Sequence, residues 1–310
     1  MHLGRELPPA HEQELIAELI ADLRHEDWST ANAVEARLVE RGAAAVVPLC
    51  HVLSFGASEQ RWRAARALGC IGDPRAVHAL SASLVVRPDA PSGPRFLSVF
   101  VNSRPNREGL LRIEAAAALG RIGAVDGVVP LCYALADPVD GVGWSAQQAL
   151  VAIGEPAVLA LCHITSSERA RARQLAAGAL GAIADLRGIA SLCRLVSDPE
   201  RAVRRAAAAA IGHFAQQHPA RELRGALAPL RRLLTLRQLA RRDIQANDGY
   251  RRTVEEAIAK IERLVPDLSS LPLPVQSPRG SYTTLPRPSE FLPSSIGNPL
   301  AVDPGAERYQ

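Results

Sequence analysis

The phrase A-L-G-x-I-G returns along the chain, in exact or varied form, at intervals close to 30 residues. Its second position, here called the anchor, is occupied in chain order by Leu38, Leu68, Leu119, Leu150, Leu180 and Ile211. Successive anchors lie 30, 51, 31, 30 and 31 residues apart, so one unit carries an insertion of about 20 residues. A fixed period of this length is typical of repeat proteins and strongly limits the folds open to the chain.

Residues at fixed distances from the anchor share one face of a helix. Four positions before it stand Val34, Ala64, Ala115, Ala146, Ala176 and Ala207, and three positions after it stand Arg41, Ile71, Ile122, Ile153, Ile183 and Phe214. These offsets match helical periodicity. Gly, or Gly-Asp-Pro as in "GDPRAV", then ends the first helix and starts a second. The second helix carries Leu49, Leu80, Leu131, Leu161 and Leu192.

Each unit is therefore predicted to be a helical hairpin that buries both helices only by stacking on its neighbours. We predict an all-α fold, an α-solenoid of about six hairpins. Residues 1–27 form a capping helix, residues 28–265 form the solenoid with an insertion at about 87–108, and residues 266–310 form a disordered Pro/Ser-rich tail.

Two segments resemble the short bacterial type of HEAT repeat, first named from phycobilisome lyase subunits. "SDPERAVRRAAAAAIGHF" carries a D-P-x-x-x-V-R-x-x-A-A phrase, and "ALGCIGDPRAVHAL" carries an A-L-G-x-I-G-D-x-x-A-V phrase. The resemblance covers roughly residues 28–265. It implies the solenoid fold and leaves the function open, because such repeats serve many unrelated roles.

Four of the five cysteines recur at one place in the second helices, within "PLCHVL", "PLCYAL", "ALCHIT" and "SLCRLV". These residues are Cys50, Cys132, Cys162 and Cys193. Stacked helices lie about 8–10 Å apart, whereas a disulfide needs Cα atoms within about 7 Å and a zinc–sulfur bond is about 2.3 Å long. We interpret these residues as a buried column of small apolar side chains and expect no metal and no other cofactor.

No catalytic motif is found. The chain has no P-loop, G-x-S-x-G, H-E-x-x-H or G-x-G-x-x-G motif. Deoxyhypusine hydroxylase, an enzyme with this kind of repeat, binds two irons through His-Glu pairs set in several repeats. Here such pairs occur only at His11-Glu12 and His25-Glu26, before the first clear repeat. We therefore expect a protein without enzymatic activity.

A column of arginines precedes the anchors by seven positions, at Arg61, Arg112, Arg173 and Arg204. We predict a structural ladder of ion pairs, with Asp73, Glu155 and Asp185 as candidate partners. The next column holds Trp62, Ile113 and Trp144, which we interpret as packing residues or surface anchors rather than a cofactor site.

Two features suggest surfaces for a partner. The insertion holds Phe96 and Phe100, which are predicted either to contact a partner or to pack back on the solenoid. Residues 201–242 contain ten Arg and one Glu, which forms a basic pole suited to an acidic partner. The candidate contact residues in this pole are Arg204, Arg205, Arg231, Arg232, Arg237, Arg241 and Arg242.

The tail repeats a Leu-Pro phrase in "SSLPLP" and "TTLPRP", which indicates either a linker or a duplicated peptide ligand. No run of about 18 apolar residues predicts a membrane span, and the odd cysteine count favours a cytoplasmic protein. We predict a non-catalytic scaffold or adaptor that binds a protein, with an acidic surface as one candidate. Two alternatives are an accessory subunit of a bilin lyase and a nucleic-acid-binding protein that uses the basic pole.

Overall fold

The computed structural model describes residues 10–24, 27–85 and 107–217, together with residues 255 and 259. Throughout these residues the secondary structure is helical, with no strand. The predicted insertion and tail, and most of the basic pole, lie outside the described residues. Arg107 and Glu108, at the end of the predicted insertion, already belong to a helix.

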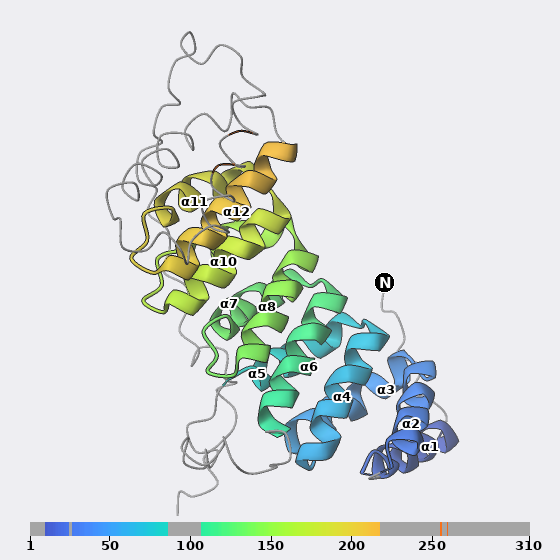
Figure 1. The fold of residues 1–310 in the computed structure, drawn as a ribbon. Coiled ribbons are helices and arrows are strands. Elements are labelled where there is room, and N and C mark those ends of the chain that lie inside the picture. Colours follow the sequence, from blue (N-terminus) through green and yellow to red (C-terminus); the bar gives the residue numbers. More distant parts are fainter. Residues whose placement is uncertain (1–9, 25–26, 86–106, 218–254, 256–258, 260–310) are drawn as a thin grey trace, which may run out of the picture.

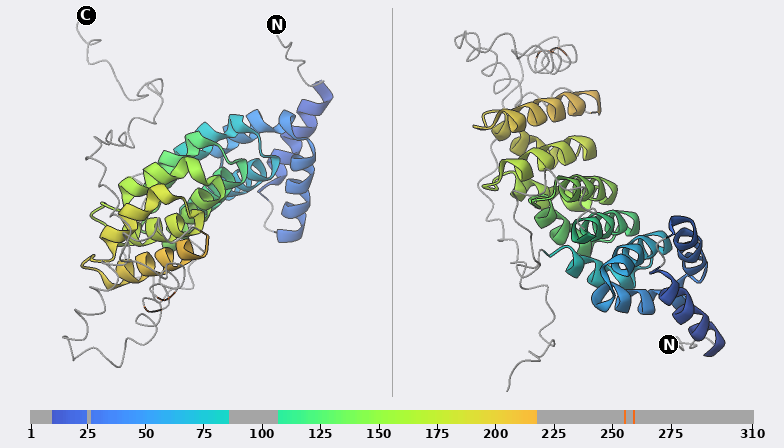
Figure 2. Two further views of the ribbon diagram at one scale, coloured as in Figure 1. Left: turned by 90° about the horizontal axis from the view of Figure 1, so that it is seen from above. Right: turned by 60° about the horizontal axis from the view of Figure 1, so that its bottom comes forward.

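The helices form hairpins that follow one another in sequence order. After α1 (Ala10–Asp22), the first helices of the hairpins are α2 (Trp28–Glu40), α4 (Ser58–Ile71), α6 (Arg107–Ile122), α8 (Asp140–Ile153), α10 (Ala170–Ile183) and α12 (Arg201–Gln217). The second helices are α3 (Ala43–Phe55), α5 (Val77–Ser83), α7 (Val128–Ala134), α9 (Val158–Ile164) and α11 (Ile189–Leu195). Figures 1 and 2 show them stacked in a row from α1 to α12, which confirms the predicted α-solenoid.

Short 3-10 helices lead from first to second helices in four of these units: η1 (Pro74–Ala76), η2 (Val125–Gly127), η3 (Glu155–Ala157) and η4 (Leu186–Gly188). Asp73 and Asp185 start two of them, because each carboxylate accepts a hydrogen bond from the backbone N–H two residues later. An Asp at this position satisfies an N–H group that has no partner within the helix.

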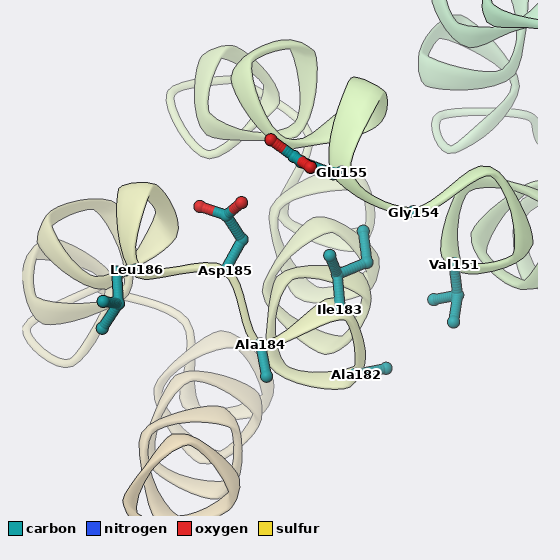
Figure 3. A pocket seen from close by; sticks show the side chains of 8 residues that line it. All are labelled: Val151, Gly154, Glu155, Ala182, Ile183, Ala184, Asp185 and Leu186. Carbon is teal, nitrogen blue, oxygen red and sulfur yellow. The ribbon is translucent and has the colours of Figure 1, made fainter. Parts of the chain in front are cut away.

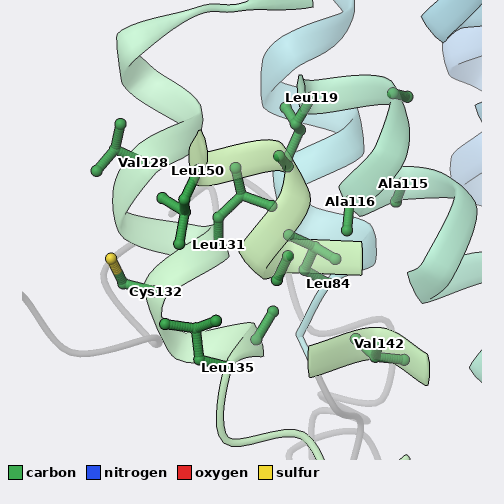
Figure 4. Packing of buried hydrophobic residues seen from close by; sticks show 14 of the residues in the cluster. Leu84, Ala115, Ala116, Leu119, Val128, Leu131, Cys132, Leu135, Val142 and Leu150 are labelled. Atoms are coloured by element: carbon green, nitrogen blue, oxygen red, sulfur yellow. The ribbon is translucent and has the colours of Figure 1, made fainter. Parts of the chain in front are cut away.

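The anchor leucines and the alanines four positions earlier form the core, as predicted. Leu68, Leu119 and Leu150 are fully buried, and so are Ala115 and Ala146. Figure 4 shows Leu131 of α7 together with Leu119 of α6 and Leu150 of α8, and Cys132 beside it. Neighbouring hairpins therefore share one continuous hydrophobic core, as expected of a solenoid.

The first helices approach one another through glycine. A Cβ atom on Gly69 would lie 2.7 Å from the Cα of Ala118, and one on Gly120 would lie 2.6 Å from the Cα of Ala149. Gly181 meets Ala210 in the same way, at 2.7 Å. All three glycines directly follow an anchor. The absence of a side chain at this column sets the spacing of the stack, since backbone atoms cannot move aside as a side chain can.

The column of arginines forms ion pairs, but with different partners from those predicted. The guanidinium of Arg112 donates to both carboxylate oxygens of Asp137, at 2.7 and 3.2 Å. Arg173 binds Asp198 in the same bidentate way, at 2.7 and 2.9 Å. Both acids lie in the loop that ends the hairpin, 25 residues after the arginine. These two pairs therefore close the α6–α7 and α10–α11 hairpins on themselves and position the start of the next hairpin, whereas Arg61 pairs with Glu108 of α6 at 2.9 Å.

The predicted partners of the ladder were wrong. Asp73 pairs with Arg75, at 2.6 Å, while Asp185 and Glu155 both pair with Arg187, at 2.7 and 2.9 Å. These acids follow the first helix, whereas the arginines of the ladder stand near its beginning. Twelve helical residues separate the two positions by roughly 18 Å, which no arginine side chain spans.

Candidate partner-binding surface

The second helices carry almost no charge. There is no Asp, Glu, Lys or Arg in α3, α5, α7 or α9, and α11 holds only Arg194. Every first helix carries at least one charged residue, and α4 and α6 carry several. Depletion of charge is a compositional mark of the buried centre of protein interfaces, so this layer stands apart from the rest of the surface.

Large apolar side chains project from this layer. Val47 is 65% exposed, Phe55 of the same helix is 74% exposed, and Leu159 of α9 is 56% exposed. Val47 and Leu159 each stand two residues before a fully buried leucine, Leu49 or Leu161. Two helical steps rotate a side chain by about 200°, so a residue at this offset necessarily points away from the core.

The same register places a row of residues on each side of the buried leucines. The row two positions before holds Val47, His78, Val129, Leu159 and Ala190, and the row two positions after holds His51, Ala82, Tyr133, His163 and Arg194. We call the part of these rows on α3, α5, α7 and α9, together with Phe55, the uncharged face. Its side chains are exposed or half-buried. The rings of His51 and Phe55 are in contact, with centroids 5.0 Å apart.

The cysteine column lies beneath this face. Cys132 and Cys162 are buried, whereas Cys50 and Cys193 are half-buried. Burial raises the pKa of Cys132 to about 12 and that of Cys193 to about 11, and it also raises the pKa of Cys50 and Cys162. Thiols with such pKa values are poor nucleophiles and poor metal ligands. In the described part of the chain, no three His, Cys, Asp or Glu side chains gather as metal ligands would.

A pocket lies between the ends of α8 and α10, where the repeat lacks the glycine that follows the anchor. Val151 occupies the position that Gly69, Gly120 and Gly181 hold in other units, and Gly178 of α10 meets only the side chain of Gln147 of α8. The resulting pocket measures about 580 Å³ (Figure 3). It is lined by Val151, Gly154, Glu155, Ala182, Ile183, Ala184, Asp185 and Leu186.

Two carboxylates border this pocket, and neither is free for chemistry. Arg187 donates one hydrogen bond to Glu155, at 2.9 Å, and others to Asp185, at 2.7 and 2.9 Å. It also reaches the backbone oxygen of Glu155 at 3.4 Å. This arrangement ties one repeat to the next, much as Arg75 donates to Asp73 and to the backbone oxygen of Ala43. We interpret the pocket as a consequence of repeat packing.

The tryptophan column divides between core and surface. Trp62 is buried and stacks on Trp28, with ring centroids 5.9 Å apart, and the guanidiniums of Arg63 and Arg66 lie within 6 Å of both rings. This cluster joins α2 to α4. Ile113 is half-buried, and Trp144 is 59% exposed on α8. The column is therefore a packing column at one end and a surface position at the other.

Of the residues predicted to contact a partner, only two are described. Arg205 is exposed on α12. Arg204 is half-buried and donates to the backbone oxygens of Asp198 and Pro199, both at 2.8 Å. The others lie outside the described residues: Phe96, Phe100, Arg231, Arg232, Arg237, Arg241 and Arg242. The uncharged face was not predicted, although its sign, four helical segments without a single charge, is plain in the sequence.

None of the described helices is by itself long and apolar enough to cross a membrane. One pair, Asp140–Ile153 with Glu155–Ile164, passes by length and composition together but is bent by 120°.

Comparison with known proteins identifies one of the repeats. A family model described as PBS lyase HEAT-like repeat matches residues 60–85, which span α4, η1 and α5. No curated protein matches the sequence.

Solved structures with some similarity include three repeat proteins. The CpcE–CpcF complex of phycocyanin lyase from Nostoc sp. PCC7120 is 20% identical, with 79% of this chain and 94% of that chain covered and a TM-score of 0.36. Human deoxyhypusine hydroxylase is 19% identical, with 81% and 97% covered and a TM-score of 0.32. A computationally designed armadillo repeat protein is 17% identical, with 79% and 99% covered and a TM-score of 0.34. Similarity this low carries no information on function. The family model alone supports the predicted resemblance: it matches the hairpin of α4 and α5 as a PBS lyase HEAT-like repeat.

Proposed function

We propose that the chain is a non-catalytic scaffold that binds a polypeptide partner on the uncharged face. The observation that carries this proposal is the absence of charge from four successive second helices that nevertheless expose Val47, Phe55 and Leu159. Monomeric soluble proteins rarely expose a large contiguous apolar patch, and such patches commonly mark interaction sites.

The physical basis for binding is the removal of apolar surface from water. Each Å² of apolar surface that a partner covers contributes roughly 25 cal/mol. A partner that binds this face removes none of the chain's charged groups from water. Such desolvation is the main cost that opposes association at charged surfaces. The solenoid beneath it is held by a continuous core and by buried ion pairs, so the face is preformed and little ordering is needed on binding.

A pair of charge substitutions tests this proposal. The variant V47E/L159E places two carboxylates in the face, where a partner would have to bury them. The control A36E/A152E adds the same charges at exposed positions of first helices in the same two hairpins. Immobilised chains are used to capture partners from a lysate of the native cell, and the captured proteins are quantified by mass spectrometry.

We expect the V47E/L159E variant to lose at least about tenfold of the specific capture, equivalent to 1.4 kcal/mol, and the control to retain it. Both variants are checked for unchanged helical circular dichroism. Equal capture by the two variants would contradict the proposed face. The basic pole around Arg205 would then become the leading candidate surface for an acidic partner.

A further inference from the structure

The uncharged face repeats with the spacing of the stacked helices. Its outward residues recur once per hairpin along the solenoid, at Val47, His78, Val129 and Leu159 in one row. Neighbouring packed helices lie about 8–10 Å apart. A ligand that crosses the second helices therefore meets an equivalent contact about every 8–10 Å.

A polyproline II helix has nearly this period. It has three residues per turn and a rise of about 3.1 Å per residue, so one side of it returns every ~9.3 Å. Polyproline II peptides dock on surfaces lined with aromatic rings. The second row of the face supplies the rings of His51, Tyr133 and His163, and Phe55 stands at its end. Both the period and the composition of the face thus suit a proline-rich peptide.

The chain contains such a peptide, outside the described residues. In the segment 283–293, "TTLPRPSEFLP", Leu285, Pro288 and Phe291 are spaced by three residues. Its two charged residues, Arg287 and Glu290, are also three apart. With three residues per turn, the apolar set and the charged set fall on different sides of a polyproline II helix. The segment is therefore amphipathic in that conformation.

The segment can reach the face. Helix α12 ends at Gln217, 68 residues before Leu285. A connection of 68 residues spans at most roughly 220–245 Å when fully extended. Five helix-to-helix steps from α12 back to the level of α3 cover about 40–50 Å. The connection is thus long enough for binding within one molecule.

We propose that the uncharged face binds the proline-rich tail of the same chain, residues 283–293, in the polyproline II conformation. Leu285, Pro288 and Phe291 contact successive second helices, and Arg287 and Glu290 face solvent. This inference rests on the proposed function of the face. It makes the tail an internal ligand that an external partner must displace, which sets a threshold on that partner's affinity.

Photo-crosslinking in the full-length chain tests the proposal. The photoreactive residue p-benzoylphenylalanine replaces Leu159 on the face, or Ala152 on the first-helix layer of the same hairpin as a control. The purified protein is irradiated at low micromolar concentration, and crosslinked peptides are mapped by mass spectrometry in the monomer band. We expect crosslinks from position 159 to the tail, and none to the tail from position 152.

Tail variants then test the register. L285S/P288S/F291S is expected to reduce the crosslink from position 159 by about tenfold or more, which corresponds to 1.4 kcal/mol or more. R287S/E290S alters the other side and should leave it unchanged. The proposal is wrong if position 159 crosslinks to no tail residue, if it crosslinks only to a second copy in a dimer band, or if the two tail variants behave alike. In each case a continued loss of capture by V47E/L159E would leave the scaffold function intact.

Discussion

Replacing Gly120 with Val is expected to unfold the middle of the solenoid or to lower its melting temperature sharply. A Cβ at this position would lie 2.6 Å from the Cα of Ala149 in the next repeat. The contact is with backbone, so α6 and α8 would have to separate along their length. Overpacking of a rigid core costs about 1–3 kcal/mol and sometimes more, and we expect about 3 kcal/mol or more here.

Calorimetry of the full-length chain measures this effect. A loss of about 3 kcal/mol lowers the melting temperature by roughly 6–12 °C for a solenoid of this size. The matched control is Ala152→Val on the exposed side of α8, which costs only the difference in helix propensity, about 0.5 kcal/mol. If both variants melt at the same temperature, the glycine column does not set the spacing of the repeats.

Removal of the buried acid Asp137 is the second large effect. Its carboxylate binds the guanidinium of Arg112 at two points and also accepts a hydrogen bond from the backbone N–H of Val139, at 2.8 Å. The side chains of Arg112 and Asp137 are only 9% and 1% exposed. Asp137→Ala leaves a charged arginine buried without its partner, which typically costs about 3–5 kcal/mol.

The double variant Arg112→Met/Asp137→Leu distinguishes two contributions to the lost stability: the loss of the ion pair itself and the cost of burying the Arg112 charge without a partner. Apolar replacement of both partners of a buried pair is often close to neutral, so the double variant should be more stable than Asp137→Ala in urea unfolding. Arg171→Gln breaks the exposed pair with Asp140, whose atoms are 3.9 Å apart, and should change stability by less than about 0.5 kcal/mol. A double variant less stable than the single one would contradict this account.

The second rung of the ladder, Arg173 with Asp198, makes a pH-dependent contribution to stability. Burial raises the pKa of Asp198. The hydrogen bonds from Arg173 and from the backbone N–H of Glu200 lower this pKa by more than burial raises it, so the pKa lies below its ordinary value. A carboxyl group with a depressed folded-state pKa stabilises the fold above its unfolded pKa, and this contribution is lost as pH falls through the folded one. The Arg173–Asp198 rung therefore stabilises its hairpin at neutral pH, and this contribution is lost in acid.

The sequence predicted the fold because the repeat supplies the same information several times. One anchor leucine with an apolar residue three positions later could belong to many helices. Six anchors in register, five of them with an apolar residue three positions later, leave little but a stack of hairpins, and Leu68, Leu119, Leu150 and Leu180 are all buried as that register requires. Gly69, Gly120 and Gly181 could be predicted as helix residues, but their contacts with alanines of the next repeat depend on how the hairpins stack.

The ladder and the uncharged face were harder to predict, for different physical reasons. Arg112 and Asp137 are 25 residues apart, so their pairing depends on the return of the chain through the hairpin. Asp73 and Asp185 are nearer in sequence to the ladder arginines than Asp137 and Asp198 are. They lie beyond the C-terminal end of the first helix, however, whereas the arginines stand near its N-terminal end. The uncharged face is formed by several helices together. The composition of one segment alone, such as Val158–Ile164, is the same as that expected of a fully buried helix.

The central claim is that polypeptides bind to the second-helix layer, and hydroxyl-radical footprinting measures this directly. The L285S/P288S/F291S chain, in which the tail does not occupy the face, is labelled alone and in complex with the partner that it captures, and oxidation is quantified residue by residue. We predict that the partner protects Val47, Tyr133 and Leu159, while Trp144, which is exposed on the first-helix layer, is oxidised equally in both samples. Protection of Trp144 with no change at Val47 and Leu159 would place the partner on the opposite layer and contradict the account.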